Sequence, residues 1–130
     1  MANRIQYNTG ATWEPIVGYS RAVRTGDTIE VSGTCAVDRD GAAMAAGDMY
    51  GQTKRILEII QVAIEHLGGS MQDVVRTRMY VTDISRWEEA GKAHGEVFSD
   101  IRPATSMIEV SKLIAPEYLI EIEATAIVLS

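Results

Sequence analysis

The chain is short of cysteine and of positive charge, and both shortages narrow what the protein can do. Its single cysteine, Cys35, excludes an intrachain disulfide and a metal site built from several thiolates. A reducing, cytoplasmic setting is the simplest one for such a chain. There are 12 Lys and Arg against 18 Asp and Glu, which gives a net charge of −6. A general nucleic-acid binder needs a basic surface to displace counterions from phosphates, so we do not expect one.

Several other signals are missing as well. The first ten residues, MANRIQYNTG, lack the apolar segment of a signal peptide, and no stretch approaches the roughly 20 apolar residues that span a bilayer. The glycine-rich patterns of dinucleotide and P-loop sites are absent, which leaves no support for a nucleotide cofactor. His66 and His94 lie far apart in sequence, without a carboxylate cluster. We therefore expect no cofactor, no metal and no membrane span.

What remains is the pattern of one α+β domain over residues 1–130, a length that suffices for a real core. A helix is predicted from about Asp48 to Leu67, because apolar or small side chains recur there at steps of three and four. Asp48 is its expected N-cap, and Gly68-Gly69 supplies a left-handed exit. The residues of this stripe are Met49, Thr53, Ile56, Ile60, Ala63 and Leu67.

A second helix is predicted from about Ser85 to Phe98. Ser85 and Glu88 have the spacing of a capping box at its start. Its expected apolar stripe contains Trp87, Ala90, His94, Val97 and Phe98.

Alternating polar and apolar residues predict strands around these helices. A short strand is expected at residues 4–7, and a hairpin turning at Gly26-Asp27. Further strands are predicted at VVRTRMYVT, ATSMIEV and LIEIEATAIVL. In the first of these, the expected apolar side consists of Val75, Thr77, Met79 and Val81. Two helices can cover only one side of such a sheet, which predicts a sandwich with an open second face.

The open face is expected to pack against copies of the same chain. Its side chains mix charge with apolar surface, which is unusual for a core and for a solvated face alike. They are Thr28, Glu30, Arg76, Arg78, Tyr80, Met107, Glu121 and Glu123. A closed ring of subunits would bury this face and leave clefts where subunits meet.

Four side chains are candidates for chemistry. Glu121 and Glu123 lie two apart on one strand, so they can act as an acid–base pair or pair with Arg76 or Arg78 across strands. His94 is either a proton shuttle or a packed histidine. Cys35 is either a nucleophile or a small buried residue.

Five segments together resemble the Rid family, also called YjgF or L-PSP. They are GYSRAV, TIEVSG, GDMYGQTKRILEII, VVRTRMYVTDIS and RPATSMIEV…LIEIEATA, in the expected order across nearly the whole domain. The resemblance implies a fold similar to chorismate mutase of the bacillus type: a mixed sheet with two helices on one face. It also implies a homotrimer whose sheets line a central barrel, with a small-molecule ligand at each subunit interface.

Deaminating members of this family hydrolyse reactive enamines and imines such as aminoacrylate. The resemblance implies that Glu121 is the catalytic residue, which positions water. Tyr19 and the backbone at Gly33 match the family's substrate-binding positions.

The arginine of the family's P-A-R-S motif, which grips the substrate carboxylate, is replaced here by Thr105. Thr105 is still expected to line the cleft, but it offers one neutral hydrogen bond. Arg102 is a poor substitute because three steps along a strand reverse the face. Gly91 and His94 stand where the family has asparagine and tyrosine. This pocket does not favour the usual 2-imino acid substrate.

Two functions are therefore expected. The first is a hydrolase acting on C–N bonds, which deaminates a different imine or enamine with Glu121, with His94 and Cys35 as secondary candidates. The alternative is a non-catalytic trimer that binds a small molecule or protects a partner protein. The acidic balance disfavours the endoribonuclease activity that the family's older label suggests.

Overall fold

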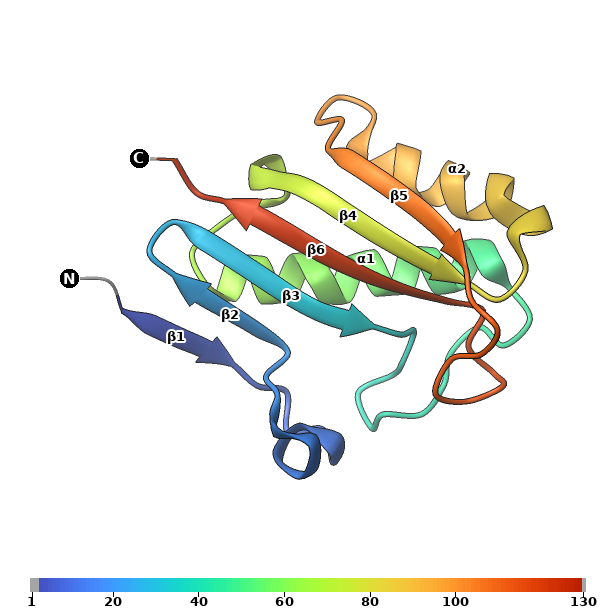
Figure 1. Ribbon diagram of the computed structural model, residues 1–130, viewed down its shortest axis with the longest axis horizontal. Coiled ribbons are helices and arrows are strands. Elements are labelled where there is room, and N and C mark those ends of the chain that lie inside the picture. The colour runs from blue at the N-terminus through green and yellow to red at the C-terminus, as the bar shows by residue number, and fades with distance from the viewer. Residues whose placement is uncertain (1–2, 130) are drawn as a thin grey trace.

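The computed structural model describes residues 3–129 and contains, within them, one six-stranded sheet and two α-helices (Figure 1). The strands are β1 (Arg4–Tyr7), β2 (Ala22–Thr25), β3 (Thr28–Thr34), β4 (Val74–Val81), β5 (Ala104–Glu109) and β6 (Ile120–Ile127). The helices are α1 (Met49–His66) and α2 (Trp87–Phe98), and the short turns are η1 (Glu14–Gly18), η2 (Met71–Asp73) and η3 (Ile84–Arg86).

The sheet is mixed and has the strand order β1-β2-β3-β6-β4-β5. β4 and β5 are parallel, whereas the other neighbouring pairs are antiparallel. A parallel pair needs a crossover, and α2 supplies it between β4 and β5. Both helices lie on the same side of the sheet (Figure 1). This confirms the expected mixed sheet with two helices on one face.

Helix α1 forms as the sequence predicts. All six residues of its predicted stripe are buried. The Asp48 side chain accepts a hydrogen bond from the Gly51 amide at 2.9 Å, which satisfies an amide that the first turn leaves free. The chain leaves the helix through Gly68, whose φ of 88° is left-handed.

The predicted start of α2 is wrong. The Asp83 side chain accepts hydrogen bonds from the Ser85 amide and hydroxyl, at 3.0 and 2.6 Å. Asp83 thereby caps η3, and α2 continues from this turn at Trp87. Since the Ser85 hydroxyl donates to Asp83, the predicted capping box with Glu88 does not form.

The predicted stripe of α2 is only partly right. Ala90, Ala93 and Phe98 are its buried residues. Trp87 and Val97 instead remain 54% and 38% exposed. Burial through the two alanines keeps the helix close to its neighbours, and Trp87 and Val97 lie outside that contact.

Strand β4 departs from simple alternation at its start. The register with β6 shifts between Val74 and Arg76. As a result Val75 is 42% exposed, contrary to the prediction, while Thr77 and the alternate residues after it are buried. An extra residue at such a shift leaves the core side of the sheet.

The open face exists as expected, with one correction. Exposed or half-buried side chains occupy Thr28, Glu30, Arg76, Arg78, Tyr80, Glu121 and Glu123. Met107 does not belong to this face. It lies opposite the buried Met79 in the β4–β5 register and packs against the core on the helix side.

Candidate ligand site on the open face

Glu121 lies on the open face of β6, directly over Gly33. Its neighbours Ile120 and Ile122 point into the core, so strand alternation turns Glu121 outward. A Cβ atom at Gly33 would collide with the Oε2 atom of Glu121. The register of β3 against β6 is also irregular between Val31 and Thr34, the stretch that contains Gly33. Glycine is therefore required here to let the carboxylate sit against the backbone.

Cys35 holds the same carboxylate from one side. Its thiol donates to Oε1 of Glu121, with 3.4 Å between sulfur and oxygen. Burial and the negative charge of Glu121 raise the pKa of Cys35 from 9.0 to about 12, although Arg21 acts in the opposite direction. The thiol is thus protonated at neutral pH and cannot serve as a thiolate nucleophile. It acts as a hydrogen-bond donor that orients Glu121.

Arg21 approaches Gly33 from the other side. Its Nη2 atom donates to the Gly33 carbonyl at 2.6 Å, and its guanidinium carbon lies 5.6 Å from the centre of the Tyr19 ring. The Nε atom is buried and has no hydrogen-bond partner in the described chain. We call Tyr19, Arg21, Gly33, Cys35 and Glu121 the acid cluster.

Sequence reasoning did not single out Arg21. The apolar neighbour was a usable signal for the orientation of Arg21, because Ala22, the next residue, is 1% exposed and lies in the core. Alternation therefore turns Arg21 toward the open face. What the sequence could not supply was the register that brings β2, β3 and β6 together at this point.

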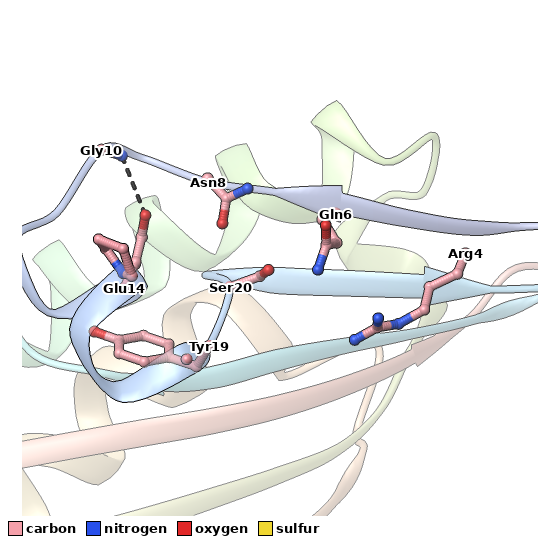
Figure 2. Close-up of a pocket in the computed structure, with 9 residues that line it drawn as sticks. Arg4, Gln6, Asn8, Gly10, Glu14, Tyr19 and Ser20 are labelled. Carbon is pink, nitrogen blue, oxygen red and sulfur yellow. Dashed lines mark hydrogen bonds between the residues drawn. The ribbon is translucent and has the colours of Figure 1, made fainter.

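A cleft of about 420 Å³ lies beside the acid cluster and shares Tyr19 with it (Figure 2). Arg4, Gln6 and Asn8 line its other wall. Glu14 also lines it but is only 4% exposed. The Glu14 carboxylate accepts from the Thr9 amide and hydroxyl and from the Gly10 amide. The Glu14 carboxylate thus stabilises the loop before η1, and these hydrogen bonds occupy it, so it is not a candidate for acid–base chemistry in the cleft.

Thr105 lies elsewhere, on the helix side of the sheet. It pairs with Thr77 across the β4–β5 register, and their hydroxyl oxygens are 2.7 Å apart. The Thr77 hydroxyl is in turn 2.9 Å from Nε2 of His94 on α2. Burial lowers the pKa of His94 from 6.5, so its ring is neutral at pH 7. We call Thr77, His94 and Thr105 the threonine–histidine chain.

The remaining candidates take separate places. Glu123 faces Arg78 in register, but its carboxylate accepts from the Tyr80 hydroxyl at 2.9 Å. Arg76 donates to Ser106 at 2.8 Å, so neither arginine forms the ion pair that was one alternative for Glu123. Arg102 lies in the turn after α2 in a left-handed conformation with φ 56°, where its amide donates to the Phe98 carbonyl. The structure therefore brings Tyr19, Gly33, Cys35 and Glu121 together, and leaves Thr105, His94 and Arg102 outside that group.

No three His, Cys, Asp or Glu side chains within residues 3–129 lie close enough to hold a metal ion. Over the same residues, neither helix combines the length and the apolar character that crossing a bilayer requires.

The fold places the protein in the chorismate mutase-like class, to which solved YjgF/UK114 structures belong. Residues 9–128 match the family model described as Endoribonuclease L-PSP. The chain belongs to this family, the one also called Rid or YjgF.

Individual relatives agree with this assignment. A RutC family protein of Pyrococcus abyssi is 35% identical over 113 residues, which are 87% of this chain and 88% of that protein. The crystal structure of Rv2704, a YjgF/YER057c/UK114 family member from Mycobacterium tuberculosis, is 47% identical with a TM-score of 0.89 and covers 97% of this chain and 100% of that one. RidA from an Antarctic Psychrobacter is 27% identical with a TM-score of 0.78, over 85% of this chain and 89% of that one.

Proposed function

We propose that the protein hydrolyses a small imine or enamine at the acid cluster, with Glu121 as the acid–base group. One observation carries this proposal. The Glu121 carboxylate is held on an uncovered face by Cys35 and by contact with Gly33, and no cation among residues 3–129 forms an ion pair with it. A carboxylate fixed in this way can take a proton from a water molecule.

The chemistry needs no group beyond this carboxylate and water. Glu121 accepts a proton from water as the water oxygen bonds to the carbon of the C=N group, and the C=N π electrons move to nitrogen. The same proton then passes to the nitrogen of the resulting carbinolamine. Glu121 then takes the proton of the carbinolamine hydroxyl and delivers it to the amino nitrogen as the C–N bond breaks, so that ammonia and a carbonyl compound leave. An enamine enters the same route after protonation at carbon gives its imine.

The Rid resemblance adds Tyr19, the Gly33 backbone and Thr105 as substrate contacts. Within one chain, Gly33 contacts Glu121 directly, and Arg21 links Tyr19 to Gly33. Thr105 points to the opposite side of the sheet, so any contact that it makes with the same substrate would have to come from a neighbouring subunit.

A homotrimer with a ligand cleft at each interface is part of the proposal. Both helices cover one side of the sheet (Figure 1). Exposed or half-buried charged and polar side chains remain on the other side, which suits a face that packs against copies of itself. Analytical ultracentrifugation should give the mass of three 14.2 kDa chains. Sedimentation as a single chain at micromolar concentration would contradict this part of the proposal.

Ammonia release from imines tests the activity. Imines can be generated in place by an amino-acid oxidase or by a flavin amine oxidase, which gives substrates with and without a carboxylate. Wild-type protein should accelerate ammonia release from at least one of them. Glu121→Gln should lose that acceleration by a factor on the order of 10²–10⁴, the usual contribution of a general acid–base group. Full activity in Glu121→Gln would overturn the role of Glu121.

A second candidate is a trimer that binds a small molecule without turning it over. The loss of the P-A-R-S arginine favours it, since the Thr105 hydroxyl is engaged with Thr77 and with the Pro103 carbonyl. Ligand binding at equal affinity in wild type and Glu121→Gln, with no ammonia released from any imine, would favour this candidate over the hydrolase.

A further inference from the structure

We infer that Thr105 is a nucleophile, activated by His94 through the Thr77 hydroxyl, and that it takes the acyl group of an activated ester or thioester. This is a second reactive centre, on the side of the sheet opposite Glu121, and it does not depend on the proposed imine hydrolysis. It gives the threonine–histidine chain a chemistry of its own.

The three side chains form one continuous line of hydrogen bonds. The hydroxyl oxygens of Thr105 and Thr77 are 2.7 Å apart, and the Thr77 oxygen is 2.9 Å from Nε2 of His94. Both distances lie within the roughly 2.6–3.2 Å over which a base takes a proton from a hydroxyl group. The fold fixes this line, because β4 and β5 pair Thr77 with Thr105 in register and α2 carries His94.

Of the three side chains, Thr105 is the one that a substrate can reach. Thr77 is fully buried and His94 is half-buried, whereas Thr105 is exposed. Thr105 also lies on β5, the last strand of the sheet (Figure 1). Thr77 therefore cannot attack a substrate and can only pass a proton inward. A nucleophile at the surface with its base beneath it is an arrangement suited to acyl transfer.

His94 is in the right state to act as the base. Burial lowers its pKa from 6.5, so the ring is neutral at pH 7. Burial is the one cause of this shift among residues 3–129, so no charged group of β4, β5 or α2 acts appreciably on the ring. The Phe98 ring packs against the imidazole, with 4.6 Å between their centroids. Nε2 can accept a proton from Thr77 when the ring proton is on Nδ1.

Two oxygens compete for the Thr105 proton. Its hydroxyl lies 2.7 Å from the Thr77 oxygen and 3.2 Å from the Pro103 carbonyl oxygen. A hydroxyl has one proton to donate, and the shorter distance favours Thr77 as the acceptor. That bond connects the exposed hydroxyl to the base.

The reaction needs no group beyond the threonine–histidine chain and the acyl donor. The Thr105 proton passes to the Thr77 oxygen while the proton of Thr77 passes to Nε2 of His94. The Thr105 oxygen bonds to the acyl carbon, and the carbonyl π electrons move to the carbonyl oxygen. They return as the bond to the leaving group breaks, and the leaving group keeps the bonding electrons. The imidazolium then gives its proton to water, and Thr105 is left as an ester.

The competing interpretation is that these hydrogen bonds only hold β5 and α2 against β4. It predicts a loss of stability when a member is removed, but no special reactivity at Thr105. Thr25 is a matched control within the same molecule. It is an exposed threonine at the end of β2, and no histidine among residues 3–129 bonds to its hydroxyl.

The experiment uses p-nitrophenyl acetate as the acyl donor, with the full chain as wild type, Thr105→Ser, Thr105→Val and His94→Gln. Peptide mass spectrometry after short exposure gives the acetylation rates of Thr105 and Thr25 in one sample, separately from those of the lysines. Glutamine at position 94 can accept a hydrogen bond from Thr77 but cannot take up its proton. Thermal unfolding shows whether each variant remains folded.

We expect Thr105 of the wild type to be acetylated at least about a hundred times faster than Thr25, which is the lower end of what a general base contributes. Thr105→Ser should keep the labelling at this position, and Thr105→Val should lose it. Folded His94→Gln should label Thr105 at nearly the rate of Thr25. The wild-type rate at Thr105 should level off above pH 6.5, where His94 is neutral, while the hydroxide-driven rate at Thr25 continues to rise.

Equal acetylation rates at Thr105 and Thr25 would overturn the inference, and so would undiminished labelling of Thr105 in folded His94→Gln. If His94→Gln does not fold, the pH profile of the wild type decides, and a rate at Thr105 that keeps rising with hydroxide would contradict the relay. The imine assay reports on Glu121 alone. A negative result there leaves this inference standing, just as a negative acetylation result leaves the proposed hydrolase standing.

Discussion

The acid cluster and the threonine–histidine chain lie on opposite faces of the same sheet and differ in charge. The acid cluster carries Arg21 and Glu121 on the open side. The threonine–histidine chain links a neutral ring to two hydroxyls on the helix side. In the Rid resemblance, Thr105 and Glu121 belong to one pocket, yet within one chain strand alternation separates them completely.

Burial acts on both groups in the same physical direction. It disfavours the charged form, so it raises the pKa of the Cys35 thiol and lowers that of the His94 imidazole. Glu121 differs because it lies on the open face, between a thiol donor and a glycine. The difference teaches that, of these two groups, the one on the uncovered side holds the fixed charges and the one beneath the helices holds neutral hydrogen bonds.

The largest expected effect concerns the reactivity of Cys35. Its pKa of about 12, against 9.0 for an ordinary thiol, lowers the thiolate fraction at pH 8 about a thousandfold. Alkylation by iodoacetamide should therefore be on the order of 10²–10³ times slower in native protein than in the same protein unfolded in guanidinium chloride. Rates within a factor of about ten would show that Glu121 does not hold a protonated thiol.

Gly33→Ala tests the geometry of the open side. The added Cβ collides with Glu121 Oε2, so the carboxylate must move away from its place above the backbone. The rate of imine hydrolysis should fall by about a hundredfold, which is the size of loss expected when a general acid–base group is displaced. Gly95→Ala is the matched control, since a Cβ there meets no atom within 4 Å and alanine favours the helix. Similar activity in both variants would contradict the close contact between Gly33 and Glu121.

Thr77→Val tests the helix side. The hydroxyl of Thr77 joins Thr105 to His94 from a fully buried position, so its removal leaves both partners short of a hydrogen bond. The free energy of unfolding should fall by about 1–3 kcal/mol, measured by urea denaturation. Thr125→Val, on the open face, is a control that should change stability by less than about 0.5 kcal/mol. Comparable losses of unfolding free energy in the two variants would contradict the claim that the hydroxyl on the helix side contributes more to stability than the one on the open face.

The smallest effect concerns pH. Because the folded pKa of His94 lies below its ordinary value of 6.5, the unfolded chain binds more protons in the interval between the two pKa values. Stability from this residue is therefore present above pH 6.5 and is lost as the pH falls through the folded pKa. His94→Gln should flatten the slope of unfolding free energy between pH 7 and 5. An unchanged slope would show that the ring is not desolvated.

Much of the fold was predictable because hydrophobic periodicity is local information. The helix from Asp48, the hairpin at Gly26-Asp27 and the core side of β6 all follow from spacing alone. The errors occur where tertiary contacts override local signals. Asp83 takes the Ser85 hydroxyl from the expected capping box, and a register shift turns Val75 outward.

The candidate site was predictable only in part. Family resemblance indicated Tyr19, Gly33 and Glu121, and the structure places them around one point of the sheet. The position of Arg21 in the site could not be predicted, because its partner is a backbone carbonyl on another strand and no residue pattern indicates such a contact. The orientation of Thr105 depends on its register with Thr77, which no residue pattern specifies.

A crystal structure with pyruvate bound tests the central claim most directly, because it shows which face of the sheet receives the ligand. We predict that pyruvate lies at the acid cluster with its carbonyl carbon beside Glu121. Pyruvate bound at the threonine–histidine chain, with the acid cluster empty in the same crystal, would contradict it.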